Sequence, residues 1–228
     1  LGDVARPEIN IITVEDPVEF RMRGINQVQV NNKAGMTFAA ALRSILRADP
    51  DVVLIGEIRD QETANIAIEA SLTGHLVLST LHTNDAPSAV TRLTEMGVEP
   101  FLLSSSLAAV MAQRLARRLC KKCKRQDTAT EAELRTLGVP HMPDTPLPTI
   151  WRPVGCRECA NTGYSGRVAI QQVMGVDSTM EDLIARGATS IDIDKAAKEQ
   201  GMTTLRKDGW QKALQGITSV EEVLRVTV

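Results

Sequence analysis

Apolar residues in the first half of the chain form three short runs, each ending in polar or ionisable residues. The runs cover residues 10–15, 51–58 and 75–81 and are rich in β-branched and leucine residues. The first two are typical of buried strands, and the third predicts a further strand. Between them, Thr37 and Asp60 each precede a stretch with helical patterning, as capping residues do. Strands that alternate with helices predict an α/β fold with a parallel sheet. Ligands of such sheets bind outside the carboxyl ends of the strands.

The second half of the chain has a different pattern. A long helix is predicted from Pro100 to about Leu119, with small residues on its early part and a basic end. A strand is predicted over residues 167–174. From Ser178 onward the chain has several helical patterns, which are separated by the glycines Gly187, Gly201 and Gly216.

All four cysteines lie in two Cys-x-x-Cys pairs, Cys120 with Cys123 and Cys156 with Cys159, which 32 residues separate. Each pair can place two thiolates on one ion, and two pairs complete a tetrahedral zinc site. Two disulfides are the alternative, but they suit an oxidising compartment, for which the sequence has no signal peptide. We therefore predict a structural zinc ion. Four sulfur ligands leave no open coordination position, so we expect no catalytic role for it.

Seven basic residues and no acidic ones lie between Arg114 and Arg125. This basic run could bind acidic lipid headgroups or nucleic acid. We favour a plainer interpretation, in which part of the run compensates the negative charge of the zinc site and the rest is the solvated end of a helix.

Ionisable side chains lie at the ends of the three predicted strands: Glu15, Glu57 and His82. The second run with its acid, DVVLIGE, resembles a Walker B strand, whose carboxylate holds Mg²⁺ beside nucleotide phosphates. Glu15 could orient or deprotonate an attacking water, and His82 could touch a γ-phosphate. Singly, each residue has a plain explanation, such as a surface turn or a loop histidine. Their joint position at three strand ends favours a site.

Composition and charge narrow the class of protein. The 228 residues suffice for one core with a small satellite, and their formal net charge of −2 offers no general attraction for nucleic acid. No run approaches the roughly 20 apolar residues of a membrane span, and the first residues lack the order of a signal peptide. We therefore expect a cytoplasmic protein. The chain starts at Leu1 with a strand close behind, so we also expect it to be part of something longer.

Several segments together resemble the type II secretion and type IV pilus assembly ATPases of the secretion ATPase superfamily. ITVEDPVEF is similar to the family's Asp box, DVVLIGEIRD to its Walker B motif, and GHLVLSTLHTNDAPSAVTRL to its His box. QRLARRLC, the four cysteines and GYSGRVAI are similar to its zinc-bearing region, which pilus retraction ATPases lack. The tail GMTTLRKDGWQKALQGITSVEEVLRVT resembles its C-terminus, so the resemblance spans essentially the whole chain.

The resemblance implies three segments: a partial RecA-like P-loop NTPase core over residues 1–118, a four-cysteine zinc subdomain over 119–165, and a C-terminal strand and helical region over 166–228. It implies a homo-hexamer that uses ATP and Mg²⁺ at the cytoplasmic face of the inner membrane. The implied partners are inner-membrane platform proteins, with acidic phospholipids as a further candidate and no specific nucleic acid. Secretion and pilus assembly both stay open.

Residue roles follow from the same resemblance. Glu15 would polarise the attacking water, Glu57 would act through Mg²⁺, and His82 would contact or sense the γ-phosphate. Arg59 and Asp60 complete the Walker B match as expected cofactor-binding residues. The four cysteines would bind Zn²⁺. Which of the two glutamates is the base stays open.

The sequence departs from the family pattern at one essential motif. No G-x-x-x-x-G-K-[ST] loop, which would cradle the triphosphate, occurs in the 228 residues. The resemblance places that loop upstream of Leu1, so we expect this chain alone to bind ATP poorly and to be inactive. Two alternatives stay open: an adapter that lost its phosphate loop, and a non-catalytic zinc module that binds a partner protein or nucleic acid.

Overall fold

The computed structural model describes residues 1–227, and their contacts divide the chain into two compact units. Unit 1 comprises residues 1–108 and 176–194, and unit 2 comprises residues 109–175 and the chain from residue 195 onward. Each unit therefore combines two separate stretches of sequence. The three segments expected from the motifs stay a prediction, because they group residues by family resemblance and not by packing.

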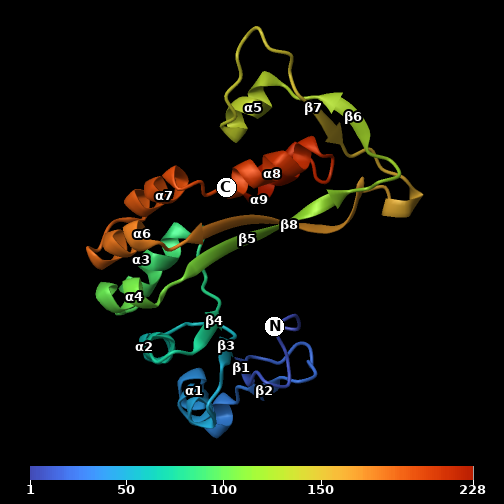
Figure 1. Cartoon of the computed structure of the whole chain (residues 1–228). Helices are drawn as coiled ribbons and strands as arrows, with labels where there is room; N and C mark the ends of the chain where they lie inside the picture. Colours follow the sequence, from blue (N-terminus) through green and yellow to red (C-terminus); the bar gives the residue numbers. More distant parts are fainter. Residues whose placement is uncertain (228) are drawn as a thin grey trace. The chain divides into compact units, whose positions relative to one another are not determined.

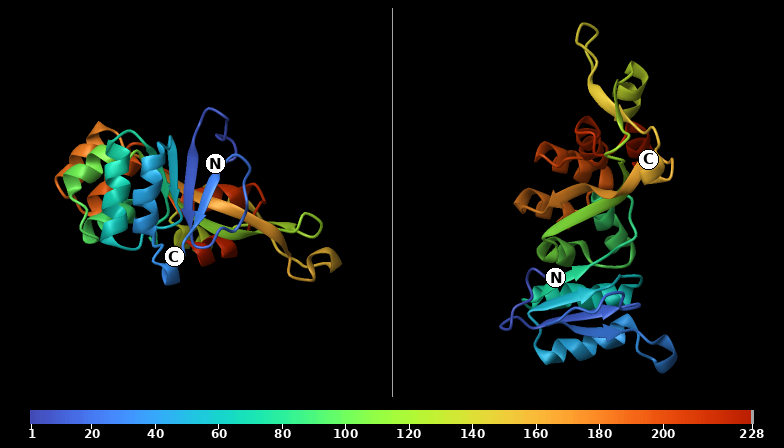
Figure 2. Two further views of the ribbon diagram at one scale, coloured as in Figure 1. Left: turned by 90° about the horizontal axis from the view of Figure 1, so that it is seen from below. Right: turned by 90° about the vertical axis from the view of Figure 1, so that its right-hand side faces the viewer.

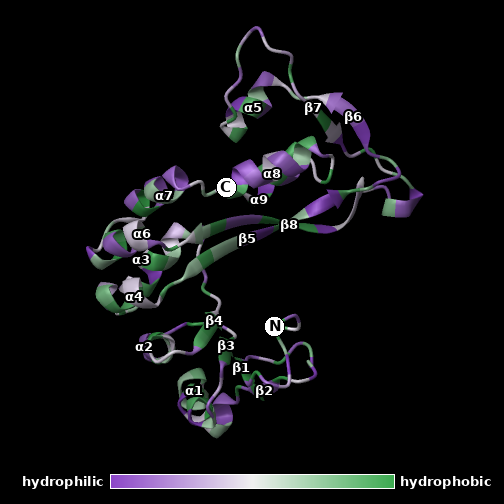
Figure 3. Cartoon of the chain, viewed as in Figure 1, coloured by the Kyte–Doolittle hydropathy of each residue, from purple (hydrophilic) through white to green (hydrophobic). Residues whose placement is uncertain are grey.

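A sheet of four parallel strands forms the centre of unit 1 (Figure 1). In the order β2-β1-β3-β4, its strands are β2 (Asn26–Gln29), β1 (Ile11–Glu15), β3 (Val52–Ile55) and β4 (Leu76–Ser79). The side chains of Val14, Val53 and Ile55 on the two central strands are fully buried. Figure 3 shows the hydrophobic character of β1 and β4. The predicted parallel α/β sheet is confirmed.

Two helices cover one side of this sheet (Figure 2): α1 (Phe38–Ile45) and α2 (Gln61–Leu72). The predicted caps are confirmed, because the Thr37 side chain accepts a hydrogen bond from the Ala40 amide and the Asp60 side chain accepts one from the Thr63 amide. α1 contacts β1, α2 contacts β4, and the two helices contact each other. Both connections run in the same direction across the sheet, so right-handed crossovers place both helices on one face.

Further helices complete unit 1. They are α3 (Pro87–Glu95), α4 (Pro100–Ser106), α6 (Ser178–Ala185) and the start of α7 (Ser190–Glu199), with short 3₁₀ turns η1 (Asn32–Ala34) and η2 (Leu46–Ala48). α4 packs against α6, with Leu103, Met180 and Ile184 almost fully buried. Residues 176–194, which follow β8 in the sequence, therefore pack as part of unit 1.

Unit 2 is built on two antiparallel strand pairs. β5 (Ala109–Leu119) pairs with β8 (Tyr164–Gly175), and β6 (Arg125–Thr128) pairs with β7 (Thr149–Arg152). Its helices are α5 (Glu131–Leu137), α8 (Leu205–Leu214) and α9 (Val220–Val226), and a 3₁₀ turn, η3, covers Arg157–Cys159. Ile150, Ile170, Trp210 and Val223 belong to one buried cluster that joins these elements.

The predicted long helix is wrong beyond Ser106. α4 ends there, and the residues that follow form the strand β5. Burial alternates along β5: Ala112 and Ala116 are buried, whereas Met111 and Leu115 are exposed. Alanine, leucine and arginine favour a helix locally, but pairing with the distant strand β8 outweighs that preference.

The helices in the C-terminal region end at the glycines that the sequence predicts. Gly187, Gly201 and Gly216 all have positive φ angles, and each follows the end of a helix, α6, α7 and α8 respectively. No helix within residues 1–227 has both the length and the apolar character needed to cross a membrane.

Candidate functional site

The carboxyl ends of three parallel strands bring the predicted strand-end residues to one edge of the sheet. Glu15 is the last residue of β1, whereas Glu57 and His82 come shortly after β3 and β4. His82 Nε2 lies 3.1 Å from Oε2 of Glu57. Residues far apart in the sequence therefore meet where open α/β sheets bind their ligands. We call this group the acidic edge.

Two partners hold the Glu57 carboxylate. Arg59 forms an ion pair with Oε1, and His82 contacts Oε2. The Glu57 side chain is 14% exposed, against 61% for Arg59 and 89% for His82. The hydrogen bond from Arg59 lowers the pKa of Glu57; burial opposes this shift, and His82 adds to it. Glu57 is therefore a stable anion and a poor proton acceptor.

Glu15 is held differently. The Thr13 hydroxyl and the Gln27 amide both donate to Oε1 of Glu15, at 2.5 and 3.0 Å. No residue among 1–227 donates a hydrogen bond to its other oxygen, Oε2. Thr13 and Gln27 were missed in the sequence. Thr13 could have been found from its spacing, because residues i and i+2 of a strand share a face.

A cavity of about 440 Å³ opens at the acidic edge. Four carboxylates line it, from Glu15, Asp16, Glu19 and Glu57, together with apolar surface that includes Phe38. Clustered carboxylate oxygens fit a hard divalent cation such as Mg²⁺. His82 contacts Glu57 but does not line this cavity.

Arg59 and Asp60 have structural partners. Arg59 pairs with Glu57, as described above. Both oxygens of Asp60 accept hydrogen bonds from Thr63, one from its amide at 2.8 Å and one from its hydroxyl at 3.0 Å. Asp60 thus serves as the N-cap of α2, and its expected role in cofactor binding stays a prediction.

The second predicted site lies in unit 2, where the four cysteine sulfurs form one cluster. The four Sγ atoms lie within 4.8 Å of one another. The separations are 3.9 Å for Cys120–Cys156, 3.8 Å for Cys123–Cys159 and 3.7 Å for Cys156–Cys159. Zinc–sulfur bonds of about 2.3 Å in a tetrahedron place sulfurs roughly 3.8 Å apart. The cysteines are free, not disulfide-bonded, and the cluster fits one tetrahedral ion.

Backbone amides point at the sulfurs of this cluster. The Cys156 and Gly163 amides donate to Sγ of Cys159, and the Gly155 amide donates to Sγ of Cys123. Burial raises the pKa of the Cys159 thiol, but hydrogen bonds from two backbone amides and from the neighbouring thiols together outweigh burial and lower the pKa to about 6. Burial raises the pKa of Cys123 to about 11. The amides directed at the sulfurs favour the thiolate form, which is the form that binds a metal ion.

The cysteine cluster requires a glycine at position 163. Its φ is +77°, and a Cβ added there would lie 2.5 Å from the Cβ of Pro153. Its carbonyl accepts a hydrogen bond from the Cys120 amide at 2.9 Å, while its own amide donates to Cys159. One glycine thus ties the two Cys-x-x-Cys pairs together, and a side chain would separate them.

A family model described as "Type II/IV secretion system protein" matches residues 1–225. The chain belongs to this family. The match covers nearly the whole length and confirms the resemblance seen in the sequence motifs.

Curated relatives within the family are named for both secretion and pilus assembly. "Type II secretion system protein E" of Aeromonas hydrophila and "Type IV pilus assembly ATPase PilB" of Thermus thermophilus are each 51% identical across 100% of this chain. The chain covers 44% of the first and 26% of the second. Protein E of Pseudomonas aeruginosa is 56% identical over 96% of the chain, which covers 43% of that protein. The chain thus spans less than half the length of these relatives.

Solved structures agree with the family. The chain superposes on the pilus retraction motor PilT with bound ADP at a TM-score of 0.68, with 25% identity, over 96% of this chain and 52% of that one. The ATPase DotB of Legionella pneumophila gives a TM-score of 0.64 at 21% identity over 96% of this chain and 51% of that one, a likeness of fold. The chain therefore shares its fold with the pilus retraction motor PilT and with the ATPase DotB.

Proposed function

We propose that this chain is the C-terminal part of the ATPase domain of a RecA-like hexameric motor, which hydrolyses ATP to drive type II secretion or type IV pilus assembly. The observation that carries the proposal is the acidic edge, where Glu15 and Glu57 open into one cavity and His82 contacts Glu57. The motor would work in the cytoplasm, against platform proteins of the inner membrane.

The two glutamates are suited to different tasks. Among residues 1–227, no group donates to Oε2 of Glu15, so this oxygen can accept a hydrogen bond and then a proton from the attacking water. Glu57, whose pKa is lowered, remains an anion suited to hold Mg²⁺ directly or through water. When bound, Mg²⁺ would neutralise charge on the nucleotide phosphates. We therefore assign Glu15 as the base.

His82 and Arg59 would form the side of this site that faces the nucleotide phosphates. Both side chains are largely exposed and reach Glu57 from the solvent side. A hydrogen-bond donor placed beside the phosphates can stabilise the negative charge that develops on them. His82 is thus proposed to sense the γ-phosphate through its contact with Glu57.

In unit 2, the four cysteines would hold a structural Zn²⁺. Support comes from their tetrahedral spacing and from the amides directed at two of the sulfurs. Zinc with four thiolates has no place for water or substrate, so its part is to hold the backbone between Cys120 and Cys159.

The experiment that tests the motor function uses a chimera. This chain would replace the matching 227 residues of the Aeromonas hydrophila protein E, so that the relative supplies the rest of the protein. We expect magnesium-dependent ATP hydrolysis, and we expect Glu57→Gln to reduce it at least about 100-fold. Glu69→Gln is the matched control, because Glu69 is exposed on α2. An inactive chimera that folds and binds zinc would contradict the proposal.

The isolated 228-residue chain would be assayed beside the chimera as a second test. They contain no phosphate-binding loop of the expected pattern, so we expect weak ATP binding and no measurable turnover. Robust magnesium-dependent hydrolysis by the isolated chain, abolished by Glu57→Gln, would overturn this expectation.

A further inference from the structure

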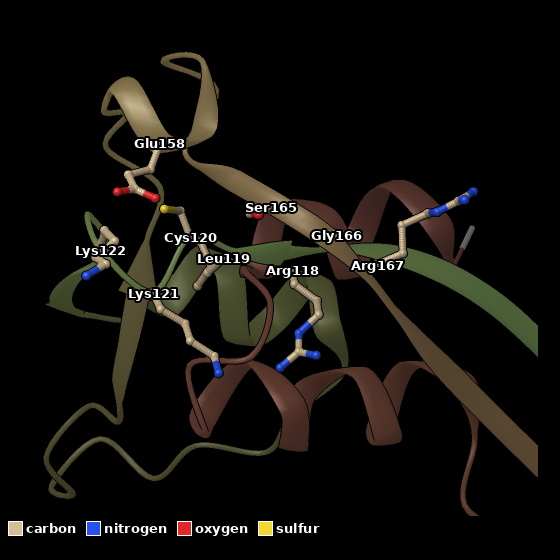
Figure 4. A pocket seen from close by; sticks show the side chains of 9 residues that line it. All are labelled: Arg118, Leu119, Cys120, Lys121, Lys122, Glu158, Ser165, Gly166 and Arg167. Atoms are coloured by element: carbon tan, nitrogen blue, oxygen red, sulfur yellow. The ribbon is translucent and has the colours of Figure 1, made fainter.

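Charged side chains line two cavities of the chain, and the two linings differ in kind. The cavity in unit 2, of about 350 Å³, has a lining that includes the basic residues Arg118, Lys121, Lys122 and Arg167 (Figure 4). In Figure 4 the Arg167 side chain extends away from the side chains of Arg118 and Lys121. At the acidic edge of unit 1, by contrast, the uncharged side chain of Gln27 is directed at the carboxylate of Glu15. Hydrogen bonds within the chain therefore fix the arrangement around Glu15.

The register of the parallel strands β1 and β2 places Gln27 on the same face of the sheet as Glu15. Thr13 pairs with Gln27, and Glu15 pairs with Gln29. Paired residues of neighbouring strands share a face, as do residues two apart on one strand, so all four side chains lie on one face. Nε2 of Gln27 lies 3.0 Å from Oε1 of Glu15. Gln27 thus contacts the proposed base, although it lies outside every segment that resembles the family motifs.

Three hydrogen bonds fix the orientation of the Gln27 side-chain amide. Its Nε2 donates to Oε1 of Glu15 and, at 2.9 Å, to the carbonyl oxygen of Phe20. Its own Oε1 accepts a hydrogen bond from the Met22 amide at 2.8 Å. If the amide were turned over, its oxygen would face two other oxygens and its NH₂ group would face an N–H group. The amide therefore has one favourable orientation, with an N–H directed at Glu15.

The same amide holds the segment that borders the cavity of the acidic edge. Residues 16–25 connect β1 to β2, and several of them line this cavity, including Asp16, Glu19 and Phe20. Gln27 bonds the backbone of this segment at Phe20 and Met22. The wall of the cavity and the Glu15 carboxylate thus share one anchor.

Gln27 and Thr13 donate to the same oxygen of Glu15, and this restrains the other oxygen. The torsion that turns a glutamate carboxylate is broad when nothing holds the group. With Thr13 donating from β1 and Gln27 from β2, Oε1 of Glu15 cannot move without loss of two hydrogen bonds. Oε2 thereby keeps one direction. Position is critical for a base, because a displacement of about 1 Å can reduce a rate about 100-fold.

We propose that Gln27 is a positioning residue for ATP hydrolysis, which holds the Glu15 carboxylate so that its Oε2 faces the attacking water. This inference rests on the proposed function, in which Glu15 is the base. Gln27 does not line the cavity, so it acts through Glu15 and not on the nucleotide.

Steady-state kinetics of the chimera test this role. Gln27→Met keeps the length of the side chain and removes the amide, so kcat should fall about 10- to 100-fold while KM for ATP stays unchanged. Gln29→Met is the matched control. Gln29 lies on the same face of β2, and its Oε1 accepts a hydrogen bond from the Val18 amide at 3.3 Å. Within residues 1–227 it makes no hydrogen bond to Glu15, so this variant should turn over ATP like the original.

A double variant separates positioning from a purely structural role. Once Glu15→Gln has removed the base, Gln27→Met should cause no further loss of kcat, because a residue that acts through Glu15 has no effect of its own. Circular dichroism and nucleotide affinity would confirm the fold of each variant. An undiminished further loss in the Glu15→Gln background would overturn the proposal, as would equal losses in Gln27→Met and Gln29→Met.

NMR of the isolated 228-residue chain tests the contact without turnover. The side-chain NH₂ resonance of Gln27 should shift in Glu15→Gln, because a hydrogen bond to a carboxylate is shorter and stronger than one to an amide oxygen. The resonance of Gln29 should move less. An unchanged Gln27 resonance would overturn the proposal. An active chimera that is indifferent to Gln27→Met would contradict the positioning role alone, whereas a shifted resonance together with an inactive chimera would contradict the proposed function.

Discussion

Side chains hold the acidic edge in place, whereas backbone amides hold the cysteine cluster. At the acidic edge, side chains hold side chains: Arg59 and His82 hold Glu57, and the cavity beside them is open. In the cysteine cluster, backbone amides point at sulfurs that lie 3.7–3.9 Å apart. The open cavity leaves room for a ligand and water beside the carboxylates, whereas four sulfurs around one ion leave no open coordination position. The first arrangement therefore favours chemistry and the second favours structure.

Removal of the metal should have the largest effect on stability, and the loss of stability should be confined to unit 2. Zinc binding contributes about 10–16 kcal/mol to the folding of small zinc peptides, so a chelator should strongly loosen residues 120–159. Hydrogen exchange would show faster exchange there than in β1 and β3. Unchanged exchange and unchanged limited proteolysis after zinc removal would contradict the structural role of the cluster.

The next largest effect is expected at Glu222, the buried acid of α9. Its carboxylate is 1% exposed and accepts hydrogen bonds from Arg117 and Arg225. Burial raises the pKa of Glu222, but Arg225 and Arg117 outweigh it and lower the pKa to about 2. Glu222→Gln should therefore lower the free energy of unfolding of unit 2 by about 3 kcal/mol at neutral pH.

The pH dependence of this effect has a definite sign. The contribution of Glu222 is complete above its unfolded pKa of 4.5 and is lost as the pH falls toward 2. The difference between Glu222→Gln and the original chain should therefore shrink between about pH 5 and pH 2. Glu221→Gln is the control, because Glu221 is 53% exposed and its ion pair should contribute little. A Glu222 effect that is independent of pH would contradict this account.

A smaller effect on stability is expected for Asp60, and its variants distinguish the role of Asp60 as the N-cap of α2 from its expected role in cofactor binding. Asp60→Ala should lower the free energy of unfolding of unit 1 by about 1 kcal/mol, because the N-cap of α2 is lost. Asp60→Asn keeps a capping side chain and should restore stability. Loss of ATP hydrolysis by Asp60→Asn in the chimera, with stability unchanged, would instead show that Asp60 contacts the cofactor.

The smallest expected effect is a pKa shift at Glu57. Arg59→Gln should raise the pKa of Glu57 toward its ordinary value of 4.5, since the hydrogen bond from Arg59 is the largest cause of its lowering. Titration of the side-chain carboxyl carbons by NMR would measure this shift. An unchanged pKa would show that the ion pair seen here does not form in solution.

Much of the fold was predictable because local and tertiary preferences agree. Thr37 and Asp60 cap the helices that their positions predict, and the cysteine spacing predicts the cluster. β5 was not predictable, because residues that favour a helix became a strand through pairing with β8. Gln27 was missed for the same kind of reason, since only the β1–β2 register brings it to Glu15.

The most direct test of the central claim is the effect of Glu15→Gln on turnover in the chimera. If Glu15 is the base, turnover should fall by about 10²–10⁴-fold. Nucleotide affinity and zinc content should stay unchanged, because Thr13 and Gln27 can still hold the side chain. Turnover that is unchanged by Glu15→Gln, or nucleotide binding that is lost together with turnover, would contradict the claim that the acidic edge is the catalytic site.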